Sequence, residues 1–330
     1  MLGRHRSAVR RRRTQAAVAL AWAAGLLLLA ALPSACAAKA TGAASPATAS
    51  PATAAAGGNT ERTAKASDPA GGGGNDWRHV LQVVANLKAH PPAEPLVVLL
   101  GGSAARESTV SDADWAAQIA ADGGHAVAAY NLGSRNRTLA QDVALVKLLP
   151  KGPAIVYIGI NLGRFTSAPS APTIKLPEPD ASLPPYDQHQ YTQTDIKSAA
   201  QKAALVSAWL SDRYPFFKAN YATSLKTLSA LVAACKDRGF KPVLLELPRD
   251  TAIIGRSLDA PTSKFTTDCK KLARSAGAPW VSFVARAKLP DGDFYDLWHL
   301  VEPGREVWQK LLSQQTASLL KQYGMAGAGQ

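Results

Sequence analysis

The sequence predicts an α/β fold, in which a five-stranded parallel sheet is covered by helices on both faces. Between about residues 77 and 323, short apolar runs alternate with amphipathic segments of helical period. Continuous apolar runs are typical of strands that are buried on both faces. This stretch of about 245 residues is long enough for one large hydrophobic core.

The strands are predicted where short apolar runs stand between helical patterns. They are residues 96–100, 126–130, 154–158, 243–247 and 280–283. Because helical segments separate most of them, we expect parallel neighbours joined by crossover helices.

The helices are predicted from apolar residues at helical spacing and from end signals. They are residues 77–89, 112–121, 139–149, 195–210, 215–238 and 303–321, with a further helix around Cys269. Ser111 or Asp112 is a suitable cap for the second helix, and Pro303 stands in the first turn of the last one.

The N-terminal part of the chain reads as a targeting segment followed by a linker. Residues 1–14 carry six arginines and no acidic residue, and residues 15–32 are nearly all apolar. This pattern predicts that residues 1–36 form an export signal or an uncleaved membrane anchor. Residues 37–76 are rich in Ala, Thr, Ser, Pro and Gly, which predicts a disordered tether. We therefore expect a domain at residues 77–324 outside the cytoplasm, secreted or held at the membrane through the N-terminus.

Nearly half of the net positive charge of the chain comes from the six N-terminal arginines. The formal net charge is +13, and without the six N-terminal arginines it is +7. A moderately basic exported domain suits an anionic wall polymer or lipid surface. No basic cluster interleaved with aromatic residues indicates nucleic acid. We expect a monomer whose partner is an acylated small molecule or glycan.

The three cysteines support two separate predictions. Cys36 ends the stretch Leu-Pro-Ser-Ala-Cys, an imperfect lipobox, so either lipidation of Cys36 or plain cleavage nearby is expected. Cys235 and Cys269 fall on predicted helices. Outside the cytosol such a pair is often a disulfide, and two small buried thiols are the alternative.

One long irregular segment interrupts the alternation of strands and helices. Residues 163–196 form a proline-rich insertion that leaves the sheet edge after the third strand. Such a loop is expected to be a lid, a pocket wall or a surface elaboration. No residue cluster has metal-ligand spacing and no glycine-rich loop has a nucleotide-binding pattern, so no cofactor is expected.

Small polar residues follow the predicted strands at widely separated positions. They are Ser103, Gly133 and Asn161, together with Asp296 and His299 near the C-terminus. The carboxyl ends of parallel strands share one edge of the sheet, where ligands bind. We therefore expect these residues to converge.

The residue types at these positions suit serine-dependent acyl chemistry. A serine hydroxyl becomes a nucleophile when a base takes its proton, and a carboxylate orients that base. His299 and Asp296 are the predicted base and carboxylate for Ser103. The N–H groups of Ser103 and Gly133 and the amide of Asn161 are predicted donors to an oxyanion.

At these residues the chain resembles the SGNH (GDSL-type) hydrolases, over roughly residues 95 to 320. The four sequence blocks of that family carry Ser, Gly, Asn and His, which here correspond to Ser103, Gly133, Asn161 and His299. Asp296 stands three places before the histidine, as in the family. No aspartate precedes Ser103 and none follows Asn161, so the resemblance is to divergent members.

The resemblance implies a flavodoxin-like three-layer α/β/α domain and an exported serine esterase or deacylase. The implied substrate is an O-acyl ester of a cell-surface glycan or lipid. An O-acyltransferase on a cell-envelope polymer and a non-catalytic binding module on the same scaffold are the alternatives. Arg106 and Trp298 are additional candidates for substrate binding.

Overall fold

The computed structural model describes residues 75–325, except for 124, 169, 171–172 and 183–188. The predicted export segment, Cys36 and nearly all of the predicted linker lie outside the described residues. Among the helices that are described, none has the length and apolar character needed to cross a bilayer.

The centre of the domain is a sheet of five parallel strands in the order β2-β1-β3-β4-β5. The strands are β1 (Leu96–Gly101), β2 (Ala128–Gly133), β3 (Ala154–Ile160), β4 (Lys241–Glu246) and β5 (Trp280–Ser282). This is the flavodoxin-like order, so the predicted fold class is confirmed. Only strand ends differ from the prediction: β2 continues to Gly133 because its backbone pairs with β1 as far as Gly101.

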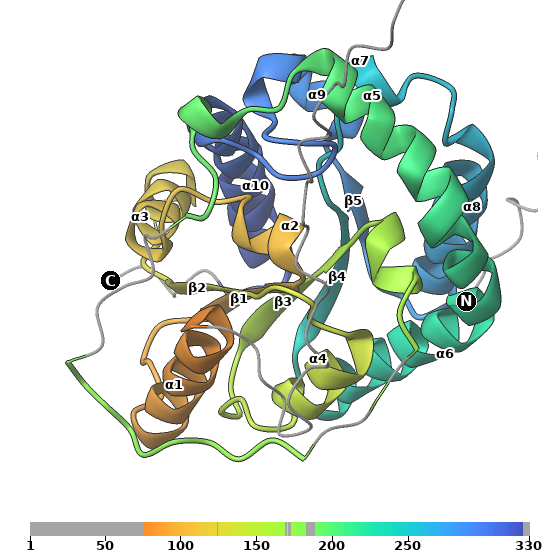
Figure 1. The fold of residues 1–330 in the computed structure, drawn as a ribbon. Coiled ribbons are helices and arrows are strands. Elements are labelled where there is room, and N and C mark those ends of the chain that lie inside the picture. Colours follow the sequence, from red (N-terminus) through yellow and green to blue (C-terminus); the bar gives the residue numbers. More distant parts are fainter. Residues whose placement is uncertain (1–74, 124, 169, 171–172, 183–188, 326–330) are drawn as a thin grey trace, which may run out of the picture. The chain divides into compact units, whose positions relative to one another are not determined.

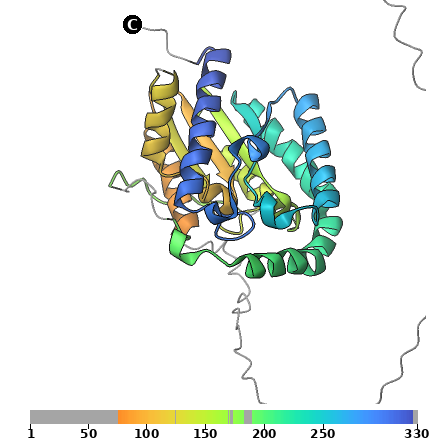
Figure 2. The ribbon, with the colours of Figure 1, turned by 90° about the horizontal axis from the view of Figure 1, so that it is seen from above.

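Helices cover both faces of the sheet (Figure 1). One face packs against α1 (Asn75–Ala89), α4 (Leu139–Val146), α6 (Tyr214–Asp237) and α8 (Asp259–Ser275). The other packs against α3 (Asp112–Gly123) and α10 (Glu302–Gln322), which lie side by side over the strands in Figure 2. Successive strand residues alternate between the two cores, which is why the strands are apolar at every position.

Shorter elements connect these layers. They are α2 (Ser103–Arg106), η1 (Leu162–Phe165), η2 (Gln193–Asp195), α5 (Ala199–Ala208), the π-helical turn η3 (Trp209–Arg213), α7 (Thr251–Ile254), α9 (Val284–Ala287) and η4 (Asp291–Asp293). The predicted helix at 195–210 starts later, at Ala199, because Ser198 caps it. It then passes into α6 through η3 without a loop.

The predicted disulfide is wrong. Cys235 on α6 and Cys269 on α8 are both free and fully buried in the core. Burial raises the pKa of both thiols, that of Cys235 to about 12. Each sulfur fills its own part of the core, so these residues behave as small apolar side chains.

The proline-rich insertion follows a path that the sequence did not reveal. Its middle part runs along α1, where the Asn86 side chain bonds to the backbone of Asp180 and that of Gln82 to Glu178 O. The insertion then returns to the carboxyl edge of the sheet at His189–Tyr191, close to Glu107 and His299.

Candidate active site

Ser103 stands at the start of a helix that packs tightly on the sheet. It is the first residue of α2, directly after β1 and Gly102. A Cβ on Gly101 would come within 2.4 Å of Ala105 Cβ, so glycine is required where α2 folds back on the strand. The first N–H groups of a helix have no acceptor within that helix, so the N–H of Ser103 is available to an acceptor outside α2.

The structure brings Ser103, His299 and Asp296 together. The Ser103 Oγ lies 2.9 Å from His299 Nε2. On the other side of the imidazole, Nδ1 lies 2.8 Å and 2.9 Å from the two carboxylate oxygens of Asp296. The His299 and Asp296 side chains are each 15% exposed, so the chain of hydrogen bonds is largely shielded but reachable.

A tight loop between β5 and α10 holds the aspartate and the histidine. Phe294 forms an antiparallel β-bridge with Leu300, and the Tyr295 N–H donates to His299 O at 2.8 Å. Asp296 Oδ1 also accepts the N–H groups of Trp298 and His299 at 2.9 and 3.0 Å. Burial acts to raise the pKa of Asp296, but His299 and these hydrogen bonds outweigh it and keep the pKa below its usual value. Asp296 is therefore an ionised partner for the imidazole.

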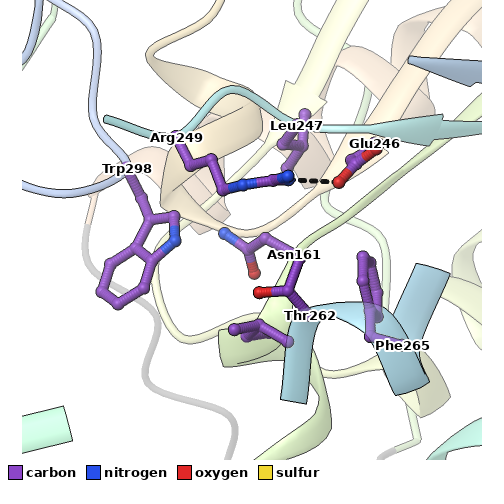
Figure 3. Close-up of a pocket in the computed structure, with 8 residues that line it drawn as sticks. Asn161, Glu246, Leu247, Arg249, Thr262, Phe265 and Trp298 are labelled. Carbon is purple, nitrogen blue, oxygen red and sulfur yellow. Dashed lines mark hydrogen bonds and ion pairs between the residues drawn. The ribbon is translucent and has the colours of Figure 1, made fainter. Parts of the chain in front are cut away.

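Asn161 follows β3 at the same edge of the sheet. Its Oδ1 caps η1 by accepting the N–H of Arg164 at 3.3 Å. This capping bond fixes the carboxamide so that its Nδ2 faces away from η1. Figure 3 shows the amide nitrogen directed into the space between Trp298 and Arg249. Capping and donation to an oxyanion are thus compatible roles for one side chain.

Gly133 is placed differently from the prediction. Its N–H donates to Asn131 Oδ1 at 3.0 Å, so this N–H is not directed at an oxyanion. A Cβ on Gly133 would lie 2.5 Å from Arg106 N, because α2 crosses the end of β2 at this point. Close approach of two backbones explains this glycine. Of the predicted oxyanion donors, Ser103 N–H and Asn161 remain candidates.

Asp112 on α3 binds the backbone of β2 at Asn131, and its raised pKa makes stability depend on pH. Its Oδ1 accepts the N–H of Asn131 at 2.7 Å, yet burial raises its pKa to about 7 despite this bond. In the unfolded chain the carboxyl ionises near 3.8. The folded state therefore binds the extra proton between these values, and stability is lost as pH rises from 4 to 7.

We expect Asp112→Asn, which keeps an acceptor oxygen but cannot ionise, to remove this pH dependence. The free energy of unfolding, measured by urea denaturation, should differ between variant and wild type by about 3 kcal/mol more at pH 7 than at pH 4. A difference that does not change with pH would contradict the assignment. Exposed Asp114→Asn is the control and should show no such trend.

Arg106 lies in a buried ion-pair network instead of the substrate site. Its guanidinium is 4% exposed and bonds to Asp76 Oδ2 at 3.0 Å and to Glu107 Oε1. Glu107, fully buried, also pairs with Arg305 at 2.7 Å. Burial would raise the pKa of Glu107, but the hydrogen bond from His189 and the charges of Arg106 and Arg305 lower it to about 2. The expectation that Arg106 contacts substrate is therefore wrong.

The returning end of the insertion lies beside the histidine. Tyr191 stacks on Tyr295 with ring centroids 4.0 Å apart, and its ring centre lies 4.9 Å from that of His299. His189 bonds to Val110 O at 2.7 Å and lies 3.4 Å from Glu107. The returning end of the insertion therefore packs beside His299, and its role as a lid or pocket wall stays a prediction.

A cleft adjoins the amide of Asn161 (Figure 3). It is small, with a cavity volume of about 10 Å³, and Leu162, Leu247, Phe265 and Trp298 form its apolar walls. Trp298 lines it, as expected of a pocket residue. Arg249, which pairs with Glu246, also lines it and was missed. It follows β4 at the same sheet edge, so the rule that found Asn161 also applies to Arg249.

The comparisons with known proteins give no family model and no curated protein that matches the chain. Among solved structures, the chain is similar to a lipase/acylhydrolase from Enterococcus faecalis, with 13% identity and a TM-score of 0.39 over 68% of this chain and 96% of that one. It is also similar to a protein named as a platelet activating factor from Streptococcus pneumonia, with 15% identity and a TM-score of 0.40 over 75% and 92%.

At this identity and TM-score, the two likenesses carry no functional argument. The chain itself shows the strand order and the residues that follow the strands at the carboxyl edge, namely Ser103, Asn161, Asp296 and His299. On the strand order, the domain has a flavodoxin-like three-layer α/β/α fold.

Proposed function

We propose that this protein is a serine hydrolase that cleaves ester bonds through an acyl-enzyme. The observation that carries the proposal is the continuous hydrogen-bonded chain from Ser103 Oγ through the His299 imidazole to the Asp296 carboxylate. A carboxylate on Nδ1 leaves Nε2 free to accept the hydroxyl proton, which is the arrangement that nucleophilic catalysis by serine requires.

The first half of the reaction forms the acyl-enzyme. His299 Nε2 takes the proton of Ser103 as Oγ attacks the ester carbonyl, and the negative charge of Asp296 stabilises the imidazolium. Ser103 N–H and the Asn161 amide donate to the oxyanion of the tetrahedral intermediate. When the intermediate collapses, the bond to the alcohol oxygen breaks, and His299 returns its proton to the departing alcohol.

The second half transfers the acyl group to an acceptor oxygen. His299 takes a proton from water, the water oxygen attacks the acyl carbonyl, and Ser103 leaves with that proton. A sugar hydroxyl in place of water would make the same site an O-acyltransferase. The predicted export segment favours an acylated glycan or lipid of the cell surface as substrate.

A fluorophosphonate probe tests the proposal directly, since it reacts with an activated serine. We expect wild-type protein to be labelled once, Ser103→Ala not at all, and Ser207→Ala as well as wild type, because Ser207 is exposed on α5. A wild-type protein that is not labelled, or labelling that persists in Ser103→Ala, would overturn the proposal and favour a binding module on this scaffold.

A further inference from the structure

Arg249 lies in the cleft that adjoins the proposed oxyanion donor. The cleft is lined by Asn161 on one side and by Trp298, the chain neighbour of His299, on another. A group bound there would extend directly from a carbonyl held at Ser103 and Asn161. This inference rests on the proposed function, because it assigns the part of the substrate that lies next to the reacting carbonyl.

The guanidinium of Arg249 is anchored by Glu246, and the Arg249 side chain is partly exposed. Its Nη1 pairs with Glu246, whose side chain is 6% exposed at the end of β4, while the Arg249 side chain is 22% exposed. A guanidinium carries five N–H donors in a planar fork. The pair with Glu246 engages the Nη1 end, so the Nε–Nη2 edge is left for a second acceptor.

The Nε–Nη2 edge of Arg249 lies in a cleft whose other lining residues are mainly apolar, so that edge can determine which substrate binds. Of the other residues that line the cleft, Thr262 is polar, and Leu162, Leu247, Phe265 and Trp298 are apolar. A charged side chain placed among apolar walls contributes specificity when it meets a partner of matching geometry. The edge of a guanidinium matches a carboxylate, which it binds by two parallel hydrogen bonds.

We propose that Arg249 binds a carboxylate carried by the substrate, with that carboxylate lying over the cleft beside Asn161 and Trp298. The carboxylate belongs either to the acyl group, as in a hemiester of a dicarboxylic acid, or to the alcohol part. Glu246 holds the guanidinium in place and competes with the substrate for its charge. Removing the charge of Arg249 should therefore lower the selectivity for carboxylated esters, and removing the charge of Glu246 should raise it.

Three esters separate the two sources of the carboxylate. Phenyl acetate carries none, phenyl hemisuccinate carries one on the acyl side, and 3-acetoxybenzoate carries one on the alcohol side. The quantity measured is kcat/KM for each carboxylated ester divided by kcat/KM for phenyl acetate. We expect Arg249→Gln to lower one of the two ratios by about 10- to 100-fold, since hydrogen bonds to charged groups are worth this much.

Two further variants distinguish binding from a structural role. Glu246→Gln, which is isosteric, should raise the same ratio, because it removes the competing carboxylate. Arg256→Gln is the matched control, since Arg256 is 97% exposed and lies seven residues further along the chain. It should leave both ratios at their wild-type values. Two unchanged ratios in Arg249→Gln would overturn the inference while ester cleavage remains.

A binding measurement keeps the inference independent of catalysis. In Ser103→Ala, saturation-transfer NMR should detect phenyl hemisuccinate or 3-acetoxybenzoate, and the double variant Ser103→Ala/Arg249→Gln should lose that signal. If wild-type protein cleaves no ester and is not labelled by the fluorophosphonate, the proposed function fails, and this measurement alone decides the role of Arg249. Equal signals in the single and double variants would overturn it.

Discussion

Replacing Asp296 with Asn should lower kcat for ester cleavage by about 10³- to 10⁴-fold, with little change in the fold. Asn keeps an Oδ1 that accepts the N–H groups of Trp298 and His299, so the loop is retained. Its second atom becomes an NH₂ donor at the oxygen that lies closer to His299 Nδ1, 2.8 Å away, and this donor favours the tautomer in which Nδ1 is an acceptor. The imidazole then carries its proton on Nε2 and cannot take the proton of Ser103.

The control for this prediction is Asp259→Asn, which changes a carboxylate with a 58% exposed side chain at the start of α8. It should retain wild-type kcat. Steady-state kinetics with phenyl acetate gives kcat, and circular dichroism checks the fold. If Asp296→Asn kept more than about a tenth of wild-type kcat, the carboxylate would not be orienting the base, and the proposed triad would be wrong.

The fold was readable from the sequence because its strongest signals are local. Apolar runs such as residues 96–100 and 154–158 stand between amphipathic helices, and that alternation allows few topologies. The convergence of Ser103 with His299 also followed, since the carboxyl ends of parallel strands share an edge. These inferences need only the period of the pattern and the place where each strand ends.

The errors arose where tertiary contacts override local preference. Arg106 and Glu107 look like a solvated helix surface, because charged residues are rarely buried. Their burial depends on partners about 200 and 30 residues away, at Arg305 and Asp76. Gly133 was assigned a donor role because its position matched a family block. No sequence pattern shows that the Asn131 side chain takes its N–H.

The burial of Glu107 has a consequence for how the two halves of the site are joined. Glu107 follows Ser103 on the turn that ends α2, and Arg305 follows His299 on the first turns of α10. Glu107 Oε2 accepts from Arg305 Nη2 at 2.7 Å, and Arg305 Nε donates to Glu107 O at 3.3 Å. This pair therefore connects the segment of the nucleophile to the segment of the base.

We expect Glu107→Gln to lower the free energy of unfolding by about 3–5 kcal/mol, because it leaves Arg305 as a buried charge without its main counter-charge. Urea denaturation at pH 7 measures this. In the fraction that stays folded, kcat should also fall, since the distance from Ser103 Oγ to His299 Nε2 is no longer held from both sides. Both effects should appear in one variant.

A double variant separates the charge from the packing. Glu107→Leu/Arg305→Met removes both ions and fills their space with apolar atoms. It should therefore cost less stability than Glu107→Gln alone, because replacing a whole buried ion pair by apolar residues is often neutral, whereas removing one partner is not. Arg106 retains Asp76 as its partner in both variants. If the double variant were instead as unstable as the sum of its single changes, the two residues would not be coupled. The ion pair would then not be what holds Ser103 and His299 in register.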